Sequence, residues 1–223
     1  MAMMTKSDEA IKKDVVDHLY WDSRVDASDV MVEVTDGEVT LSGAVPTHIA
    51  YRAAEEDVWA LSGVRRVVNK LDVQYPAGVS TPPDSEIQSR VENVLLWQHF
   101  IDFTEMEVDV DNGWVTLRGT VDAYWKKVRA EEVVLGVAGV LGVTNELAIV
   151  PTKDLDDKII AEDITAALER NIHTDVDLID VEVEDGTVTL SGSVPSLPAY
   201  RMAERIAENT FGVVMVSNEL VIR

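Results

Sequence analysis

The sequence predicts an α+β protein of three tandem α-β-β-α-β modules, each a small three-stranded mixed sheet packed with two helices. Two observations carry this prediction. A glycine-bounded piece with the core Val-Thr-Leu occurs three times, at residues 37–43, 113–119 and 186–192, so the copies lie 76 and 73 residues apart. A second piece, Asn-x-Leu, begins 32 residues after each leading glycine, at Asn69, Asn145 and Asn218. Equal internal spacing is typical of a repeated structural unit.

The modules are bounded by short proline-containing segments. Module 1 is predicted at residues 1–75, module 2 at 84–150 and module 3 at 154–223, with linkers at 76–83 and 151–153. Pro and Gly cluster in the first linker, as expected of a connection between periodic segments. Proline-rich linkers act as stiff spacers, which favours a fixed arrangement of the modules over free beads.

Each module opens with apolar residues at helical spacing. In module 1 these are Ile11, Val15 and Leu19, and the same pattern recurs 76 and 149 residues later. Ser7 and Ser85 are candidate N-caps, and acidic residues follow in the first turn, where the helix dipole favours them. A first helix is therefore expected in every module.

A hairpin follows the first helix. Val30, Val32 and Val34 alternate with mostly polar residues, which indicates a strand with one buried face. The next two residues, Asp36 and Gly37, form a dipeptide that accepts the positive φ angles of a tight turn. Asn112-Gly113 and Asp185-Gly186 are the equivalent dipeptides, so each module is expected to contain the same hairpin.

A second helix and a third strand complete the unit. The helix is expected over residues 48–61, 124–137 and 197–210, each ending before a glycine suited to a left-handed C-terminus. The last strand runs from Val67 to Val73 and over the equivalent residues. The right-handed crossover rule makes the second and third strands parallel if they are neighbours.

The repeated residues are mostly interpreted as structural. The three asparagines share strand parity with apolar residues, so their amides should point inward and need hydrogen-bond partners. One interpretation is an amide that pins a neighbouring turn or helix end; the other is cation coordination through the amide oxygen. The repeated glycines fit turns and helix ends. This structural signature comprises Gly37, Gly43, Gly63, Asn69, Gly113, Gly119, Gly139, Asn145, Gly186, Gly192, Gly212 and Asn218.

Composition restricts the class of partner. Nineteen Lys and Arg residues face 41 Asp and Glu residues, and the net charge of −22 repels nucleic-acid phosphates. Nucleic acid is therefore not expected as a partner. The chain has no cysteine, which excludes disulfides and cysteine-based zinc sites. No basic start followed by an apolar stretch is visible, so the chain as written is expected in the cytoplasm, or in the periplasm if a signal peptide was removed.

No set of catalytic side chains recurs at equivalent positions of the three modules. The four histidines occupy four different repeat positions, and Ser42 is replaced by Arg118 in module 2, so neither a metal site nor a catalytic triad is expected. An acidic run between Asp175 and Asp185 lacks the spacing of a calcium loop. It alternates with apolar residues and reads mainly as a solvated sheet face, with weak cation binding as the alternative. No cofactor is predicted.

Aromatic residues supply the candidate binding surface. Trp21 and Trp97 are equivalent, and packing and an exposed binding patch are equally favoured there. At the start of the second helix, apolar and aromatic residues stand beside Arg and Lys, as at a membrane interface, although ordinary helix packing explains them as well. Trp114 is expected on the outward side of the hairpin. The predicted lipid or partner-binding residues are Trp125, Tyr124, Ile49, Tyr51, Leu197, Tyr200 and Trp114.

The hairpin Asp-Gly-x-Val-Thr-Leu-x-Gly, a helix carrying Ala54, and the later Gly-Val and Asn-x-Leu pieces resemble the BON domain family across nearly the whole chain. The resemblance implies a non-enzymatic bacterial protein, of the osmotic-stress, transport-associated or envelope-maintenance type, that contacts phospholipid or an envelope protein. A cytoplasmic relative in the family binds potassium. The alternative hypothesis is therefore a cytoplasmic protein that binds or senses a monovalent cation, with the net charge of −22 favouring cation uptake.

Overall fold

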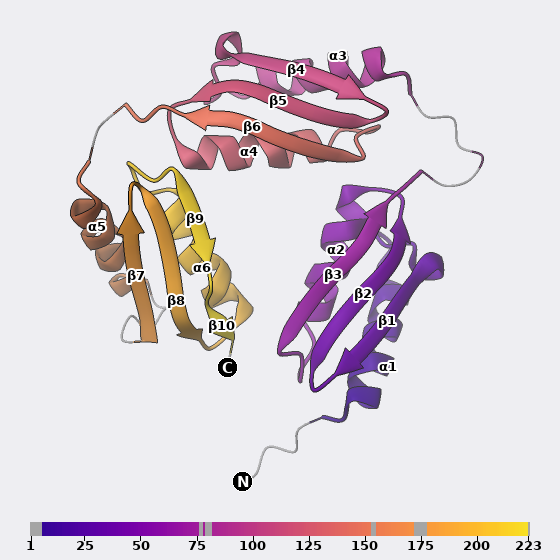
Figure 1. The fold of residues 1–223 in the computed structure, drawn as a ribbon. Coiled ribbons are helices and arrows are strands. Elements are labelled where there is room, and N and C mark those ends of the chain that lie inside the picture. The colour runs from indigo at the N-terminus through magenta and orange to yellow at the C-terminus, as the bar shows by residue number, and fades with distance from the viewer. Residues whose placement is uncertain (1–5, 76–77, 79–81, 153–154, 172–177, 223) are drawn as a thin grey trace. The chain divides into compact units, whose positions relative to one another are not determined.

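The computed structural model describes residues 6–75, 78, 82–152, 155–171 and 178–222. Every module repeats one order of elements, and Figure 1 shows each small sheet with two helices on one of its faces. Module 1 contains α1 (Asp8–Trp21), β1 (Val30–Thr35), β2 (Glu38–Val45), α2 (His48–Trp59) and β3 (Arg66–Val73). Module 2 contains α3 (Asp84–Leu96), β4 (Met106–Asp111), β5 (Trp114–Val121), α4 (Tyr124–Leu135) and β6 (Gly142–Ile149). Module 3 contains α5 (Asp157–Glu169), β7 (Ile179–Glu184), β8 (Thr187–Val194), α6 (Leu197–Glu208), β9 (Met215–Asn218) and β10 (Val221–Ile222).

The sheets have the predicted mixed topology. In module 1 the strand order is β1-β2-β3, with β1 antiparallel to β2 and β3 parallel to β2. In module 3 both β9 and β10 pair in parallel with β8. They form one strand in a single register that is interrupted at residues 219 and 220, and the Glu219 amide still donates to the Leu190 carbonyl oxygen at 2.8 Å. The α+β class and the three tandem modules are confirmed.

The hairpin turns adopt the predicted conformation. Asp36, Asn112 and Asp185 have φ near 50°, and the glycine after each has φ between 72° and 80°. Two consecutive positive φ angles are those of the tight turn that matches strand twist. An aspartate on the first helix holds the turn in every module: in module 1 the Asp8 carboxylate accepts from the amides of Asp36 at 2.8 Å and Gly37 at 3.0 Å. Asp84 and Asp157 make the same two bonds.

The second glycine of the repeat is needed for close approach. A Cβ atom at Gly43 would lie 1.9 Å from the Asp29 carbonyl oxygen, and the distances at Gly119 and Gly192 are 1.9 and 2.1 Å from the equivalent oxygens. All three glycines have φ above 100°. No other residue type fits without moving the backbone.

Helix boundaries differ from expectation at a few residues. Ser7 caps α1 as predicted, because its side chain accepts from the Ala10 amide. Ser85 does not cap α3: the helix already begins at Asp84, and the Pro83 carbonyl oxygen accepts from the Glu86 and Ile87 amides. The second helices end two residues earlier than predicted, at Trp59, Leu135 and Glu208. In α2 the final turn tightens, since the Leu61 amide bonds to the Val58 carbonyl oxygen.

Each module has its own hydrophobic core. In module 1, Ile11, Val15 and Leu19 of α1 pack against Val39 and Leu41 of β2, and all five are fully buried. The second helix contributes alanines to the core, which are small enough to let its backbone approach the sheet; they are Ala50, Ala53 and Ala54 in α2 and Ala199, Ala203 and Ala207 in α6. Among the described residues, no helix is long and apolar enough to cross a bilayer.

Candidate binding surface and polar network

In modules 1 and 2 an asparagine side chain on the third strand is hydrogen-bonded to the second helix. In module 1 the Asn69 amide nitrogen donates to the Tyr51 carbonyl oxygen at 3.2 Å, and its oxygen accepts from the Leu71 amide at 3.2 Å. In module 2, Asn145 makes the same contacts and also donates to Glu131 at 3.1 Å. The oxygen of Asn218 accepts from Leu220 in module 3. Because each amide oxygen is already occupied by a backbone donor, the geometry is that of a structural tie.

Two aromatics of the predicted binding surface make a second tie between the same elements. The hydroxyl groups of Tyr51 and Tyr200 donate to the carbonyl oxygens of Asn69 and Asn218 at 3.4 and 3.3 Å. In module 2 the equivalent residue is Lys127, whose Nζ donates to the Leu147 carbonyl oxygen at 2.8 Å. Burial raises the pKa of Tyr51. These side chains therefore hold the second helix on the sheet and do not project as free contacts.

Trp125 is half-buried at the start of α4. Its ring packs against Phe100 with the centroids 5.1 Å apart, and the Lys126 ammonium lies 5.7 Å from the same ring. Lys126 also pairs with Asp122 at 2.7 Å. Tyr124 and Leu197 are half-buried as well. The aromatic and the cation predicted to meet a membrane thus lie beside each other, with much of the tryptophan covered by its own module.

Two other residues of the predicted surface are exposed. Ile49, on the first turn of α2, is 57% exposed, and Trp114, at the start of β5, is 55% exposed. The Trp114 ring lies over Gly142 on the outward face of the sheet, where a Cβ atom would come within 2.3 Å of it. Trp114 therefore lies on the predicted side of the hairpin.

The largest exposed aromatics lie at the ends of the first helices. Trp21 is 82% exposed and Trp97 is 76% exposed, and the residue before each, Tyr20 or Leu96, is exposed too. Tyr20 and Trp21 meet edge to face, with centroids 5.5 Å apart. In module 3 the corresponding residues are Glu169 and Arg170. Of the two interpretations offered for this tryptophan pair, exposure is the one observed in the modules. We call Tyr20, Trp21, Leu96 and Trp97 the helix-one tips.

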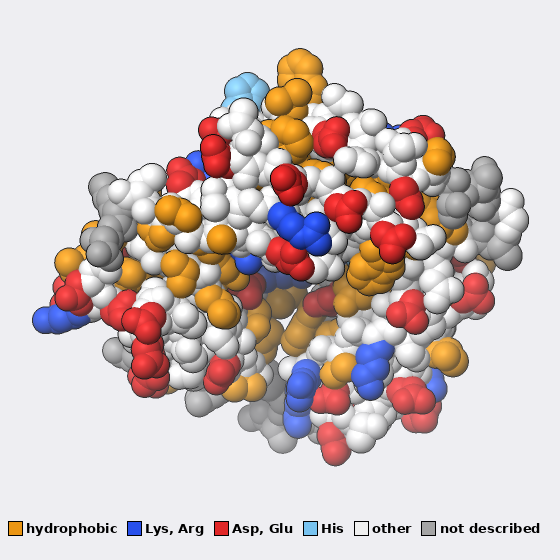
Figure 2. All heavy atoms as spheres, turned by 45° about the horizontal axis from the view of Figure 1, so that its top comes forward, with side chains coloured by type: hydrophobic (Ala, Val, Ile, Leu, Met, Phe, Trp, Pro, Cys, Tyr) orange, Lys and Arg blue, Asp and Glu red, His pale blue; other side chains and the backbone are white. Residues whose placement is uncertain are grey.

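Around these apolar residues the surface is acidic. Figure 2 shows Asp and Glu side chains spread over one face, with fewer Lys and Arg side chains among them. Every module is acidic on its own, with net charges of −6 for residues 1–75, −7 for 84–150 and −9 for 151–223. The helix-one tips are therefore apolar points on modules that attract cations and repel anions.

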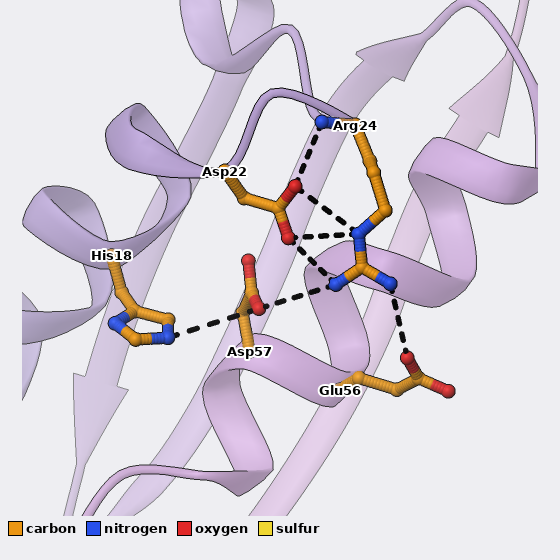
Figure 3. A network of polar contacts seen from close by, with 5 residues as sticks. All are labelled: His18, Asp22, Arg24, Glu56 and Asp57. Carbon is orange, nitrogen blue, oxygen red and sulfur yellow. Dashed lines mark hydrogen bonds and ion pairs between the residues drawn. The ribbon is translucent and has the colours of Figure 1, made fainter.

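Module 1 contains a polar network around Asp57, a position that is apolar in the other two modules (Figure 3). The Arg24 guanidinium donates to both carboxylate oxygens of Asp22, with a shortest distance of 2.6 Å, and lies 3.7 Å from Asp57 and 3.6 Å from Glu56. His18 Nε2 lies 3.8 Å from Asp57 Oδ1, the same oxygen that Arg24 approaches. Asp57 is only 7% exposed, and among the described residues its Oδ2 has no hydrogen-bond partner.

The surroundings of Asp22 and Asp57 shift the pKa values of these two carboxyl groups in opposite directions. Arg24 lowers the pKa of Asp22 to about 2. Burial, and then the charge of Asp22, raise the pKa of Asp57. Opposite shifts on adjacent carboxyls give one of them the charge and favour the proton on the other. The periodicity of the sequence does not reveal this network, although Asp57 stands where modules 2 and 3 have Val133 and Ile206.

No cluster of three or more His, Asp or Glu side chains suited to a metal ion occurs in the described part of the chain. Of the acidic run, Asp175 and Asp177 lie outside the described residues. Asp180, Glu182 and Glu184 are exposed on β7 and alternate with apolar residues that face the core. This alternation is that of a solvated strand face.

A family model and a bacterial relative agree with the repeat. The model of the BON domain family matches residues 7–75, 83–151 and 156–223. Osmotically-inducible protein Y of Escherichia coli (strain K12) is 31% identical over 197 residues, covering 82% of this chain and 92% of that protein. Two structures of CdsD from the type III secretion system of Chlamydia trachomatis align over 95% and 100% of this chain and 91% and 100% of theirs. They do so at 15% and 14% identity and a TM-score of 0.27. The chain belongs to the BON domain family and carries three copies of the domain.

Proposed function

We propose that this chain is a non-enzymatic binding protein of osmotic-stress or envelope maintenance, whose modules contact the surface of a phospholipid membrane. Its membership of the BON family and its 31% identity to an osmotically inducible protein support the biological setting. The observation that carries the membrane contact is the equivalent exposure of Trp21 and Trp97 at the ends of α1 and α3.

A tryptophan at the end of a helix suits the interfacial region of a bilayer. Its ring is large and apolar, while the indole N–H is satisfied at headgroup depth. At each tip a second apolar residue, Tyr20 or Leu96, adds to the surface that would enter the membrane. Burial of one such side chain is worth about 2 kcal/mol, so two tips acting together give a useful affinity that one tip alone would not.

The charge of the protein determines the kind of membrane. With a net charge of −22, the chain is repelled at long range by anionic headgroups. The contact is therefore apolar, strongest on zwitterionic phospholipid, and insensitive to salt there. On anionic lipid, added salt should increase binding, because it screens the repulsion.

The start of the second helix provides a second surface in the same proposal. Ile49 is exposed there, and Trp125 presents the uncovered part of its ring beside Lys126. Because Trp125 is packed on Phe100, this surface offers less apolar area than a helix-one tip.

Vesicle flotation of the full chain tests the proposal. Zwitterionic phosphatidylcholine vesicles are compared with vesicles containing phosphatidylglycerol, each at low and high salt. The wild-type protein is expected to float with phosphatidylcholine, and the double variant Trp21→Ala/Trp97→Ala is expected to stay at the bottom. Trp114→Ala is the matched control, since it removes an exposed tryptophan from a sheet face. Equal flotation of the double variant and the wild type would contradict the proposed contact.

A further inference from the structure

Modules 2 and 3 contain the same cavity, lined at equivalent positions. It lies between the start of the first helix, the hairpin turn and the glycine after the second helix. In module 2 its volume is about 340 Å³, and in module 3 it is about 620 Å³. The module 3 cavity is lined by Pro151, Leu155, Asp156, Asp157, Ile160, Asp185, Gly186, Gly212 and Val214.

In module 2 an aromatic side chain from the chain itself occupies part of this cavity. Tyr75, from the segment that leads from β3 into α3, reaches over Ile87, and its hydroxyl donates to the Gly139 carbonyl oxygen. The hydroxyl lies so close that a Cβ atom on Gly139 would be 3.4 Å from it. The preceding segment of the chain therefore supplies a side chain for this cavity, a tyrosine held by its hydrogen bond to Gly139 and by apolar contact.

In module 3 that side chain is missing. The residue equivalent to Tyr75 is Pro151, which is exposed and has no hydroxyl group. Gly212 is the equivalent of Gly139, and none of the described residues donates a hydrogen bond to its carbonyl oxygen. The apolar floor is retained, since Ile160 replaces Ile87 and Val214 replaces Leu141.

The rim of the cavity also changes its charge between the modules. Pro83 and Asn112 of module 2 are replaced by Asp156 and Asp185 in module 3, and both carboxylates are exposed. The Asp157 carboxylate is already occupied by the amides of the hairpin turn. Asp156 caps α5, since its Oδ1 accepts from the Lys158 amide at 3.0 Å. Its carboxylate is nevertheless exposed, as that of Asp185 is, so both can attract a cation next to an aromatic ring.

We infer that the module 3 cavity is a docking site for an extended peptide segment of a partner protein that carries a tyrosine flanked by lysine or arginine. The tyrosine ring lies over Leu155 and Ile160, and its hydroxyl donates to the Gly212 carbonyl oxygen, as Tyr75 does to Gly139. The basic neighbour pairs with Asp156 or Asp185. This site is separate from the proposed membrane contact and does not depend on it.

A fluorescein-labelled peptide, Lys-Val-Gln-Tyr-Pro-Lys-Gly, is the probe, because it repeats the residues around Tyr75 and adds flanking lysines. Fluorescence anisotropy with the full chain should give saturable binding. The same peptide with alanine in place of tyrosine should bind at least about tenfold more weakly, since it loses the apolar contact and the hydrogen bond. In NMR spectra the amides of Gly186 and Gly212 should shift, and those of Gly113 and Gly139 should not.

Pro151→Tyr is the decisive variant, because it gives module 3 a tyrosine at the position equivalent to Tyr75. It should abolish binding of the peptide and raise the melting temperature of the protein. Asp185→Asn, which copies module 2, should weaken binding of the basic peptide and reduce its dependence on salt. Absence of binding to the wild type, equal binding of the alanine peptide, or unchanged binding to Pro151→Tyr would each overturn the inference.

Discussion

The three modules agree where the backbone is constrained and differ where side chains reach solvent. The hairpin glycine, the clamp from the first helix and the asparagine on the third strand have nearly the same geometry in every copy. The residue at the end of the first helix does not: it is an exposed tryptophan in modules 1 and 2 and Arg170 in module 3. Repetition therefore marks the residues that build the fold, and departure from repetition marks the residues by which the surfaces of the copies differ.

The steric constraint at Gly43 should give the largest loss of stability when it is violated. Gly43→Ala places a Cβ atom 1.9 Å from the Asp29 carbonyl oxygen, so the hairpin has to move or open. We expect module 1 to lose about 4 kcal/mol of stability, enough to unfold it. Thermal and denaturant unfolding measure the loss. Gly78→Ala is the control, since nothing lies within 4 Å of that position and only its positive φ opposes the change. A variant Gly43→Ala as stable as Gly78→Ala would refute the steric argument.

The asparagine ties should come next. Asn145→Ala removes two donated bonds and leaves the Leu147 amide without its acceptor, for an expected cost of about 2 to 3 kcal/mol. Asn218→Ala should cost less, because Asn218 accepts from the Leu220 amide and contacts Glu204 but, among the described residues, its amide nitrogen makes no donated bond to a helix carbonyl oxygen as that of Asn145 does. Urea unfolding of the two variants checks the order. An equal or reversed order would show that these bonds do not determine the stability of their modules.

The network of module 1 predicts a pH dependence of stability that acts through Asp57. Asp57 has a raised pKa in the folded protein, so its contribution is favourable at low pH and is lost as the pH rises through that value. Asp57→Asn should therefore gain about 1 kcal/mol at pH 7 relative to the wild type and nothing at pH 3. Unfolding curves across this range measure the difference. A variant that is less stable than the wild type at pH 7 would mean that the pairs with Arg24 and His18 outweigh burial.

The contribution of Asp22 to stability should change with pH in the opposite direction to that of Asp57. Its pKa of about 2 means that its contribution is present at neutral pH and is lost as the pH falls from its unfolded value toward 2. Asp22→Asn should lower the melting temperature at pH 7, and this effect should shrink as the pH falls and vanish below pH 2. Melting curves of the two aspartate variants, recorded side by side, separate the carboxyl that carries the charge from the one that favours the proton. A melting temperature unchanged at pH 7 would contradict this assignment.

The sequence was sufficient for the architecture because repetition tests each local signal three times. Asp36-Gly37 alone is a common turn signal, but the same dipeptide type at three equivalent positions leaves little choice of fold. Side-chain surroundings were harder to predict. Tyr51 and Tyr200 look like a surface cluster in sequence, yet their hydroxyls bond to a strand that lies 18 residues away in the chain. A polar partner so distant in sequence cannot be identified from periodicity.

The candidate surface was predicted only in part, because a sequence pattern does not show whether a side chain is packed or exposed. Trp21 and Trp97 continue an apolar helical pattern, so the sequence alone could not separate packing from exposure. The structure separates them, because the helix ends at this point and the ring passes beyond the edge of the core. Asp57 is a polar residue that the sequence pattern of its own module does not mark as unusual. It occupies a buried position where its repeats are apolar, and only comparison among the modules marks it as different.

Removal of the exposed tryptophans should have the smallest effect on stability. Trp21→Ala/Trp97→Ala should change the free energy of unfolding by less than about 0.5 kcal/mol per site, because neither ring contributes to a core. Denaturant unfolding provides this value. A larger loss would show that the helix-one tips are structural and would remove them as candidates for a binding role.

The measurement that tests the membrane contact most directly is quenching of tryptophan fluorescence by phosphatidylcholine vesicles with brominated acyl chains. Bromine quenches only those rings that it contacts, so the depth of the helix-one tips is read without reference to the rest of the protein. The proposed contact predicts strong quenching of the wild type, unchanged quenching of Trp114→Ala after allowance for the missing ring, a small loss in Trp125→Ala, and loss of nearly all quenching in Trp21→Ala/Trp97→Ala. Quenching that persists in that double variant, or an absence of quenching in the wild type, would contradict it.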